Sequence, residues 1–233
     1  MIRGFYTGRA GMIAQQQSLD TIANNMSNAN TTGFKGQLTA FASLLYENVN
    51  GGAGAEISTG HGAKVIKNGL IFTQASLEPT QMEMDCAIDG DGFFAIENPE
   101  GGQASYTRDG SFSISIEGDQ NYLVDSNGNY VLDANYNRIN ITEGFSIDSL
   151  GIFRFDNPYG LALSGNNLFQ ATAQSGAAQI DTESKVLQGM LESSGTDVGT
   201  ETVRMIEAQR SFQLSSRMVQ AADEMEAVVN QLR

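Results

Sequence analysis

The sequence contains few of the residues on which metal and redox sites depend: it has one cysteine, Cys86, and one histidine, His61. A lone cysteine excludes a disulfide within the chain. One histidine and one cysteine supply neither a zinc ligand set nor, beyond a single candidate, a histidine-dependent triad. We interpret His61, in a glycine-rich segment, as a solvated loop residue. Phosphate-binding and nucleophile-elbow motifs are absent as well. We therefore expect no catalytic residue, no enzyme activity, no cofactor and no metal site.

Positive charge and long apolar runs are also scarce. Lys and Arg number 13 against 27 Asp and Glu, and the formal net charge is -14. Binding to nucleic acid requires a basic surface that neutralises phosphates, so we expect no nucleic-acid partner. No apolar run approaches the roughly 20 residues of a membrane-spanning helix. The first residues lack the apolar region and cleavage site of a secretory signal peptide. We therefore expect neither direct membrane insertion nor a cleaved signal peptide.

Two acidic stretches resemble calcium-binding loops, namely Asp89-Gly-Asp91-Gly and Asp125-Ser-Asn127-Gly-Asn129. In both, the glycine lies at the wrong position and no glutamate closes the loop at the twelfth place. Tight turns explain both stretches better than a metal does. A role for two carboxylates in glycoside hydrolysis remains an open alternative in a chain with 27 acidic residues, although nothing singles out one pair.

The N-terminal segment has the period of an amphipathic helix. Its apolar stripe recurs every seven residues and consists of Phe5, Met12, Leu19 and Met26, with Ile22 beside them. This spacing predicts a helix with one apolar face. Gly8 and Gln15 interrupt the stripe. The helix packs either on its own domain or on other chains.

Asparagine is concentrated where this helix is expected to end. The four residues are Asn24, Asn25, Asn28 and Asn30. Their amides compete for backbone hydrogen bonds, so a lone surface helix avoids them. Gly33 then provides a stop signal, with Phe34 placed for a hydrophobic contact behind it. The amides either cap the chain's own helix and connector, or bond to helix ends of neighbouring chains without burying a charge.

The C-terminal segment predicts a longer helix with two apolar stripes. One stripe comprises Met205, Ala208, Phe212, Ser215, Val219, Ala222 and Val229, and the other Leu214, Met218, Ala221, Met225, Val228 and Leu232. No Gly or Pro follows Gly199, which permits a helix of about 30 residues. Two stripes require neighbours on more than one side. Because neither terminal helix is stable alone in water, we expect both ends to be largely disordered in the dilute monomer and helical in a polymer.

The middle of the chain alternates short apolar runs with turn signals, as antiparallel strands do. Asp109-Gly110 and Asn127-Gly128 are typical hairpin dipeptides. Residues 48–63 are rich in glycine and indicate a mobile or extended connector. We predict an α+β fold in which N- and C-terminal helices pair or pack in a helical assembly and flank a mainly antiparallel β domain. Its parts are an N-terminal helix with an Asn-rich turn (1–36), an extended Gly-rich connector (37–75), the β domain (76–188) and the C-terminal helix (189–233).

Three ordered motifs resemble a known protein family. Residues 23–35, ANNMSNANTTGFK, are similar to the N-terminal signature of bacterial flagellar axial proteins. Residues 188–194, QGMLESS, and 205–212, MIEAQRSF, resemble the C-terminal domain of flagellar rod and hook proteins. Residues 90–94, GDGFF, and 106–112, YTRDGSF, resemble the β core of that subgroup. The resemblance covers nearly the whole chain and is to a basal-body rod protein of the distal-rod type.

This resemblance implies a structural subunit of the flagellar rod rather than a catalyst. It implies export through the flagellar type III apparatus and polymerisation with copies of the same chain into a helical tube, beside neighbouring rod and hook proteins. The terminal helices would form the inner tube, with the β domain outside. The implied location is the basal body, where the rod spans the periplasm or cell wall and transmits torque from motor to hook. We expect the subunits to pack through Phe5, Met12, Leu19, Ile22, Met26, Met205, Ile206, Phe212, Val219 and Met225, and assign the turn motif to Asn24, Asn25, Asn28, Asn30, Gly33 and Phe34.

The chain departs from the family pattern at two places. Gly195-Thr196 stands where the family often has Asn-Val, and the connector between Tyr46 and Val65 is shorter than in typical distal-rod members. A proximal-rod or hook-type subunit is therefore the alternative within the family. A secreted, β-rich module that binds a cation or a glycan is the alternative from another class of protein.

Overall fold

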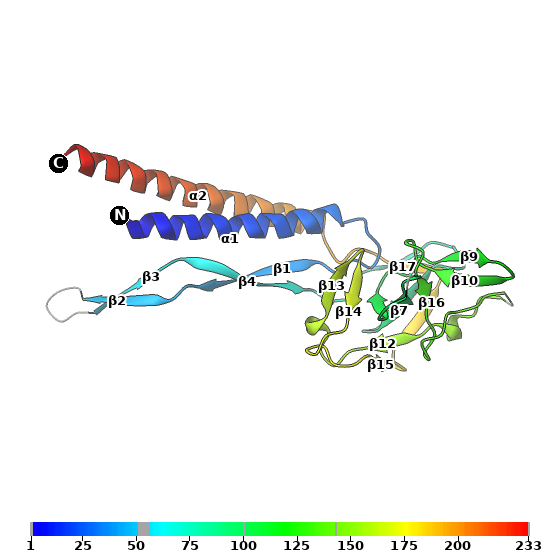
Figure 1. Ribbon diagram of the computed structural model, residues 1–233. Coiled ribbons are helices and arrows are strands. Elements are labelled where there is room, and N and C mark those ends of the chain that lie inside the picture. The colour runs from blue at the N-terminus through cyan, green and yellow to red at the C-terminus, as the bar shows by residue number, and fades with distance from the viewer. Residues whose placement is uncertain (1, 51–55, 100, 143, 233) are drawn as a thin grey trace. The chain divides into compact units, whose positions relative to one another are not determined.

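The computed structural model describes residues 2–50, 56–99, 101–142 and 144–232 (Figure 1). It divides into two compact units. The first comprises Met1–Ser27, Gln37–Leu70 and Asp197–Arg233, and the second comprises Asn28–Gly36 and Ile71–Thr196. The two ends of the chain thus belong to one unit and its middle to the other.

Two long helices, α1 (Ile2–Ser27) and α2 (Val198–Gln231), pack side by side in the first unit (Figure 1). They are antiparallel, since Gly8 near the start of α1 meets Val219 far along α2. The carboxylate of Asp197 accepts hydrogen bonds from the backbone N–H groups of Gly199 and Thr200 and so caps the start of α2. The predicted pair of terminal helices is confirmed.

Four strands form an antiparallel ribbon in the same unit. They are β1 (Gln37–Ser43), β2 (Tyr46–Asn50), β3 (Glu56–Gly60) and β4 (Ala63–Leu70). Strand β1 pairs with β4 and β2 pairs with β3, and α1 contacts both β1 and β4. The segment that we expected to be an extended connector therefore contains paired strands, while its residues 51–55 lie outside the described part of the chain.

The second unit is built on a nine-stranded antiparallel sheet. Its main path runs β13-β14-β8-β7-β11-β10-β9, and β12 joins β7 to β15. Two small sheets, β16-β6 and β17-β5, complete the unit. The strands are β5 (Leu77–Pro79), β6 (Cys86–Asp89), β7 (Phe93–Glu97), β8 (Ser105–Thr107), β9 (Ser113–Glu117), β10 (Gln120–Val124), β11 (Tyr130–Val131), β12 (Ile152–Arg154), β13 (Ala162–Gly165), β14 (Leu168–Gln170), β15 (Gln179–Ile180), β16 (Lys185–Gln188) and β17 (Met190–Glu192). Short 3-10 helices lie at Ile147–Ser149 and Pro158–Gly160.

Strand β7 supplies both faces of the core of this unit. Successive side chains of a strand point to opposite faces. Phe94 packs on Phe112 in the main apolar cluster, with ring centroids 5.1 Å apart. Phe93 packs on Phe155 and Phe169 instead. The predicted α+β class, with terminal helices and antiparallel sheets, is confirmed.

Of the two hairpin dipeptides, one is confirmed and one is wrong. Asn127-Gly128 joins the paired strands β10 and β11. Asp109-Gly110 lies between β8 and β9, which pair with other strands and not with each other. The carbonyl of Gly110 instead accepts the N–H of Cys86 at 3.0 Å, and a Cβ at Gly110 would lie 1.6 Å from the Cys86 carbonyl oxygen. Close backbone approach, rather than a hairpin, requires this glycine.

The expected role of Gly33 as the stop of the first helix is also wrong. Helix α1 ends at Ser27, six residues earlier. Gly33 has a φ of 63°, and its N–H donates to the carbonyl of Glu192 at 2.8 Å. A Cβ there would lie 2.5 Å from the backbone of Arg108. This glycine therefore serves a contact within the second unit.

Candidate assembly surface

The contact between α1 and α2 is made largely by small residues. A Cβ placed on Gly8 would lie 2.8 Å from Cγ2 of Val219, and one on Gly11 would lie 3.0 Å from Oγ of Ser215. Ala14 and Ala208 are buried in the same unit. Small side chains let two helix backbones approach closely. Gly8, which looked like an interruption of the apolar stripe, is therefore a position of close helix contact.

The predicted packing residues fall into three groups by exposure. Ile22 is buried by its own chain; Met12, Leu19, Met26, Met205, Phe212 and Val219 are half-buried; and Phe5, Ile206 and Met225 are exposed. Three residues of the first stripe of α2, Met205, Phe212 and Val219, belong to the half-buried group, so this unit partly covers that stripe. Their assignment to contacts between subunits stays a prediction.

The second stripe of α2 is exposed along its length. Leu214, Met218, Met225, Val228 and Leu232 have exposed fractions from 52% to 84%. On α1, Phe5, Tyr6 and Ile13 are exposed as well. A surface helix normally turns large apolar residues inward. We call Leu214, Met218, Met225 and Val228 of α2, together with Leu232 at its C-cap, the outer stripe.

The asparagine cluster contains a residue that serves its own chain. The side chain of Asn25, 1% exposed, donates to the backbone carbonyl of Gln37 at 2.7 Å and accepts the Gln37 N–H at 2.9 Å. This two-way bond joins the end of α1 to the start of β1, so Asn25 bonds within its own chain, as the first of the two alternatives expects; for the other three asparagines the choice stays a prediction. The Asn28 carbonyl accepts the Thr31 N–H, while Asn24 and Asn30 are exposed.

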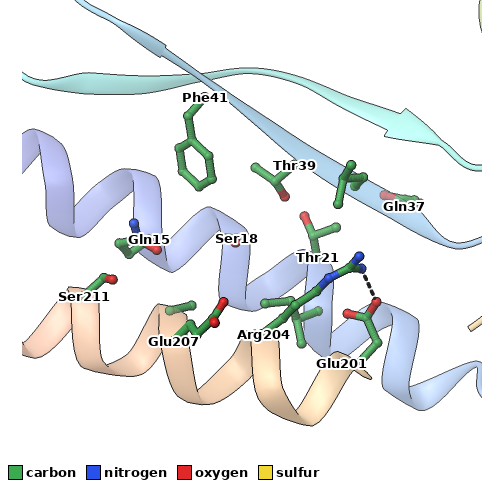
Figure 2. A pocket seen from close by; sticks show the side chains of 13 residues that line it. Gln15, Ser18, Thr21, Gln37, Thr39, Phe41, Glu201, Arg204, Glu207 and Ser211 are labelled. Carbon is green, nitrogen blue, oxygen red and sulfur yellow. Dashed lines mark hydrogen bonds and ion pairs between the residues drawn. The ribbon is translucent and has the colours of Figure 1, made fainter. Parts of the chain in front are cut away.

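A pocket of about 310 Å³ opens between α1, β1 and α2 (Figure 2). Nine of the 13 residues that line it have polar side chains, among them Ser18, Thr39, Glu201, Arg204 and Glu207. The Nη1 of Arg204 lies 2.7 Å from Oε1 of Glu201. Gln15, the second residue that interrupts the apolar stripe of α1, also lines the pocket.

The second unit contains a buried ion cluster that the sequence did not reveal. The Nζ of Lys35 lies 2.7 Å from Oε1 of Glu192, and Nη1 of Arg108 lies 3.4 Å from Oε2 of the same carboxylate. The side chains of all three are at most 2% exposed. Lys35 and Arg108 also donate to the carbonyls of Thr73 and Gly90. Each charge comes from one of the three motifs that carry the family resemblance.

Burial governs the acid–base chemistry of this cluster. Removal from water lowers the pKa of Lys35 and of Arg108, because it penalises the charged forms, while the carboxylate of Glu192 opposes that shift. The backbone pairs the same segments, since Gly195 donates to the Phe34 carbonyl at 2.8 Å. The segment that follows α1 and the segment that precedes α2 are thereby tied together. Opposite charges within motifs otherwise poor in charge were the one available signal for the cluster.

The lone cysteine and histidine occupy different settings. Cys86 is fully buried in the core cluster, where burial raises the pKa of its thiol to about 12. His61 is exposed, with Nδ1 2.9 Å from the Leu45 carbonyl oxygen. Among the described residues, no group of three His, Cys, Asp or Glu lies in a metal-binding arrangement. None of the described helices has the length and apolar character needed to cross a bilayer.

Three family models match successive parts of the chain. The model for the flagella basal body rod protein matches residues 5–35, that for the D1 domain of the flagellar hook protein FlgE/F/G matches 87–154, and that for the C-terminal part of flagellar basal body rod FlgEFG protein matches 187–232. Lys35, Arg108 and Glu192 fall one in each.

Curated relatives extend this similarity to the full length. The flagellar basal-body rod protein FlgG of Borreliella burgdorferi is 38% identical over 264 residues, covering 100% of this chain and 99% of the relative. The FlgG of Bacillus subtilis is 34% identical over 257 residues, covering 96% of each. The flagellar hook protein FlgE of Helicobacter mustelae is 36% identical over 128 residues, or 51% of this chain and 28% of the relative.

Proposed function

The chain belongs to the flagellar basal-body rod proteins, and we propose that it polymerises through its terminal helices in the distal part of the rod, where it transmits torque from motor to hook. As a member of this family it is a structural subunit, and the family implies assembly with other rod subunits. The outer stripe of α2 is the observation that carries the proposal. As partners of the outer stripe we assign copies of the same chain and neighbouring rod and hook proteins.

The outer stripe is too long and too regular to be a scatter of single surface residues. It extends from Leu214 of α2 to Leu232 at the C-cap of the same helix, and contains two methionines, whose flexible side chains adapt to slightly different neighbours. Fully burying one large apolar side chain contributes about 1.5–3 kcal/mol. Covering this stripe with helices of other subunits would therefore favour assembly.

The buried ion cluster supports a mechanical role. A subunit that transmits torque must resist separation of the segments that lead into its assembling helices. Glu192, before the start of α2, is held by charged contacts both to Lys35, beyond the end of α1, and to Arg108, directly after β8. Charge-assisted contacts with fixed geometry resist such displacement.

The test compares Leu214→Asp and Met218→Asp with Gln213→Asp, which places the same charge on an exposed neighbouring residue. Each variant is expressed in a flagellated strain that lacks its own copy of the chain. We expect the two stripe variants to keep the thermal unfolding temperature of the monomer but to abolish swimming in soft agar and lower the yield of isolated rods. Gln213→Asp should behave as the unsubstituted chain. Normal swimming of both stripe variants would contradict assembly through this face.

A further inference from the structure

The pocket between α1, β1 and α2 contains two buried polar atoms without partners (Figure 2). In the described part of the chain, neither Oε2 of Glu201 nor Oγ1 of Thr39 has a hydrogen-bond partner. Both residues line the pocket, and Glu201 is only 4% exposed. Buried polar atoms in folded proteins are nearly always satisfied, so two orphans at one pocket indicate a missing donor.

One of the two carboxylate oxygens of Glu201 accepts a hydrogen bond from its own helix. Its Oε1 accepts from Arg204, and its place in the first turn of α2 suits the positive end of the helix dipole. These contacts explain why a charge is tolerated there, but they leave Oε2 unpaired. The exposed carboxylate of Glu207 lines the same pocket. The lining therefore contains two acidic side chains, Glu201 and Glu207, and one basic side chain, Arg204. The pocket therefore carries a net negative charge.

We propose that this pocket receives an arginine side chain from a second copy of the chain. The inference rests on the proposed function, because it names one contact of the assembled rod. A guanidinium donates in several directions at once, and so can bond to the Glu201 carboxylate and the Thr39 hydroxyl together. Its charge also complements that of the pocket, whereas a neutral donor would leave the excess acid uncompensated.

The terminal helices supply the candidate arginines. Neither helix contains a lysine, and Arg9, Arg210 and Arg217 are exposed. Among the described residues, these three have no ion pair within 4.0 Å. Each is therefore available to another copy. Ordered water is the competing occupant, since a polar pocket of this size holds several molecules.

Sedimentation of the full chain over a range of concentrations tests the proposal. Glu201→Gln removes the charge with little change of shape, and Thr39→Val removes the hydroxyl. Glu224→Gln makes the same charge change on an exposed residue of α2 outside the pocket. We expect both pocket variants to raise the Kd of self-association about ten-fold. The melting temperature of the two pocket variants should not fall. The Kd of Glu224→Gln should stay within about two-fold of the Kd of the unsubstituted chain.

Double variants identify the arginine and separate the possible failures. Arg9→Gln, Arg210→Gln and Arg217→Gln are each combined with Glu201→Gln. One of them should add nothing to the Glu201→Gln effect, because both changes remove the same contact. Pocket variants that associate normally would show that water fills the site, and additive effects for all three arginines would also overturn the inference. Either result leaves the proposed function standing, whereas an unsubstituted chain that never self-associates would overturn both.

Discussion

Lys35, Arg108 and Glu192 are buried charges, and they act differently from the surface ion pairs of the same unit. Taking a charge out of water is costly, and a partner in good geometry must offset that cost. Here the carboxylate of Glu192 is the counter-charge of both cations, so the burial of Lys35 and Arg108 depends on it. It also accepts the backbone N–H of Ala75 at 2.8 Å. Removing it leaves both cations without a counter-charge, whereas removing either cation leaves the other one paired.

Glu192→Gln should therefore destabilise the second unit strongly. It leaves Lys35 and Arg108 buried without a counter-charge, a change that costs about 3–5 kcal/mol. Urea unfolding followed by tyrosine fluorescence measures the change, since the chain has no tryptophan. The matched control is Glu183→Gln, whose exposed pair with Arg154 should contribute only about 0–1 kcal/mol. An equal loss in the free energy of unfolding for the two variants would show that the cluster does not depend on Glu192.

The members of this cluster were visible in the sequence, but their pairing was not. Lys35 and Glu192 lie 157 positions apart. Spacing and periodicity describe neighbours along the chain, so they cannot show which distant charges meet. The same limit applies to Asn25, which the sequence placed correctly at the end of a helix without indicating that its amide bonds to Gln37.

The helix pair shows what a one-dimensional pattern conveys about an element. The 3–4 spacing of α2 predicted both of its stripes, and the structure distinguishes them: Phe212 and Val219 are half-buried, while Leu214 and Met218 are exposed. In α1 the same reasoning misread Gly8, because a missing side chain looks like a gap in a stripe. At the contact between the two helices, the space left by the missing side chain of Gly8 is occupied by Val219 of α2.

Alanine at two glycines of α1 should accordingly have opposite effects. At Gly4 a Cβ meets no described atom within 4 Å, so Gly4→Ala should stabilise the helix by about 0.5–1 kcal/mol through lower backbone entropy in the unfolded chain. At Gly8 the Cβ would lie 2.8 Å from Val219 and 3.3 Å from the Ser215 carbonyl oxygen. Overpacking there should destabilise by about 1–3 kcal/mol and outweigh the entropic gain. Thermal unfolding of the two variants, followed by helical circular dichroism, gives the signs; a stabilised Gly8→Ala would disprove close packing at that position.

The strands were predictable where their partners are close in sequence. Asn127-Gly128 joins β10 to the next strand along the chain, so its turn chemistry sufficed. Asp109-Gly110 carries the same signal, but β8 pairs with β7 and β14, and turn residues say nothing about a partner such as β14, some 60 residues away. Likewise, glycines in the connector concealed strands whose pairing makes the β1–β4 ribbon.

The two units of the chain differ in what holds them together. The second unit has an apolar cluster that includes Phe94, Ile96 and Leu123, and a buried ion cluster beside it. The first unit joins its helices through small residues and leaves many large apolar side chains exposed, among them Phe5, Leu214 and Met218. Small contacts bury little apolar area, and stability follows buried area. The helix pair should therefore open more readily than the sheet in a chain without neighbours.

Limited proteolysis of the dilute monomer, read by mass spectrometry, tests this difference. We expect rapid loss of most of α1 and α2, and a resistant fragment that retains Lys35 and ends near Thr196, because the ion cluster holds both segments in the second unit. Cleavage of the fragment should require about ten-fold more protease than cleavage of the helices. In isolated rods the helices should resist the same protease, since neighbouring subunits would cover the outer stripe. A monomer resistant from end to end would show that one chain stabilises its own helices, and the exposed stripe would then need another explanation.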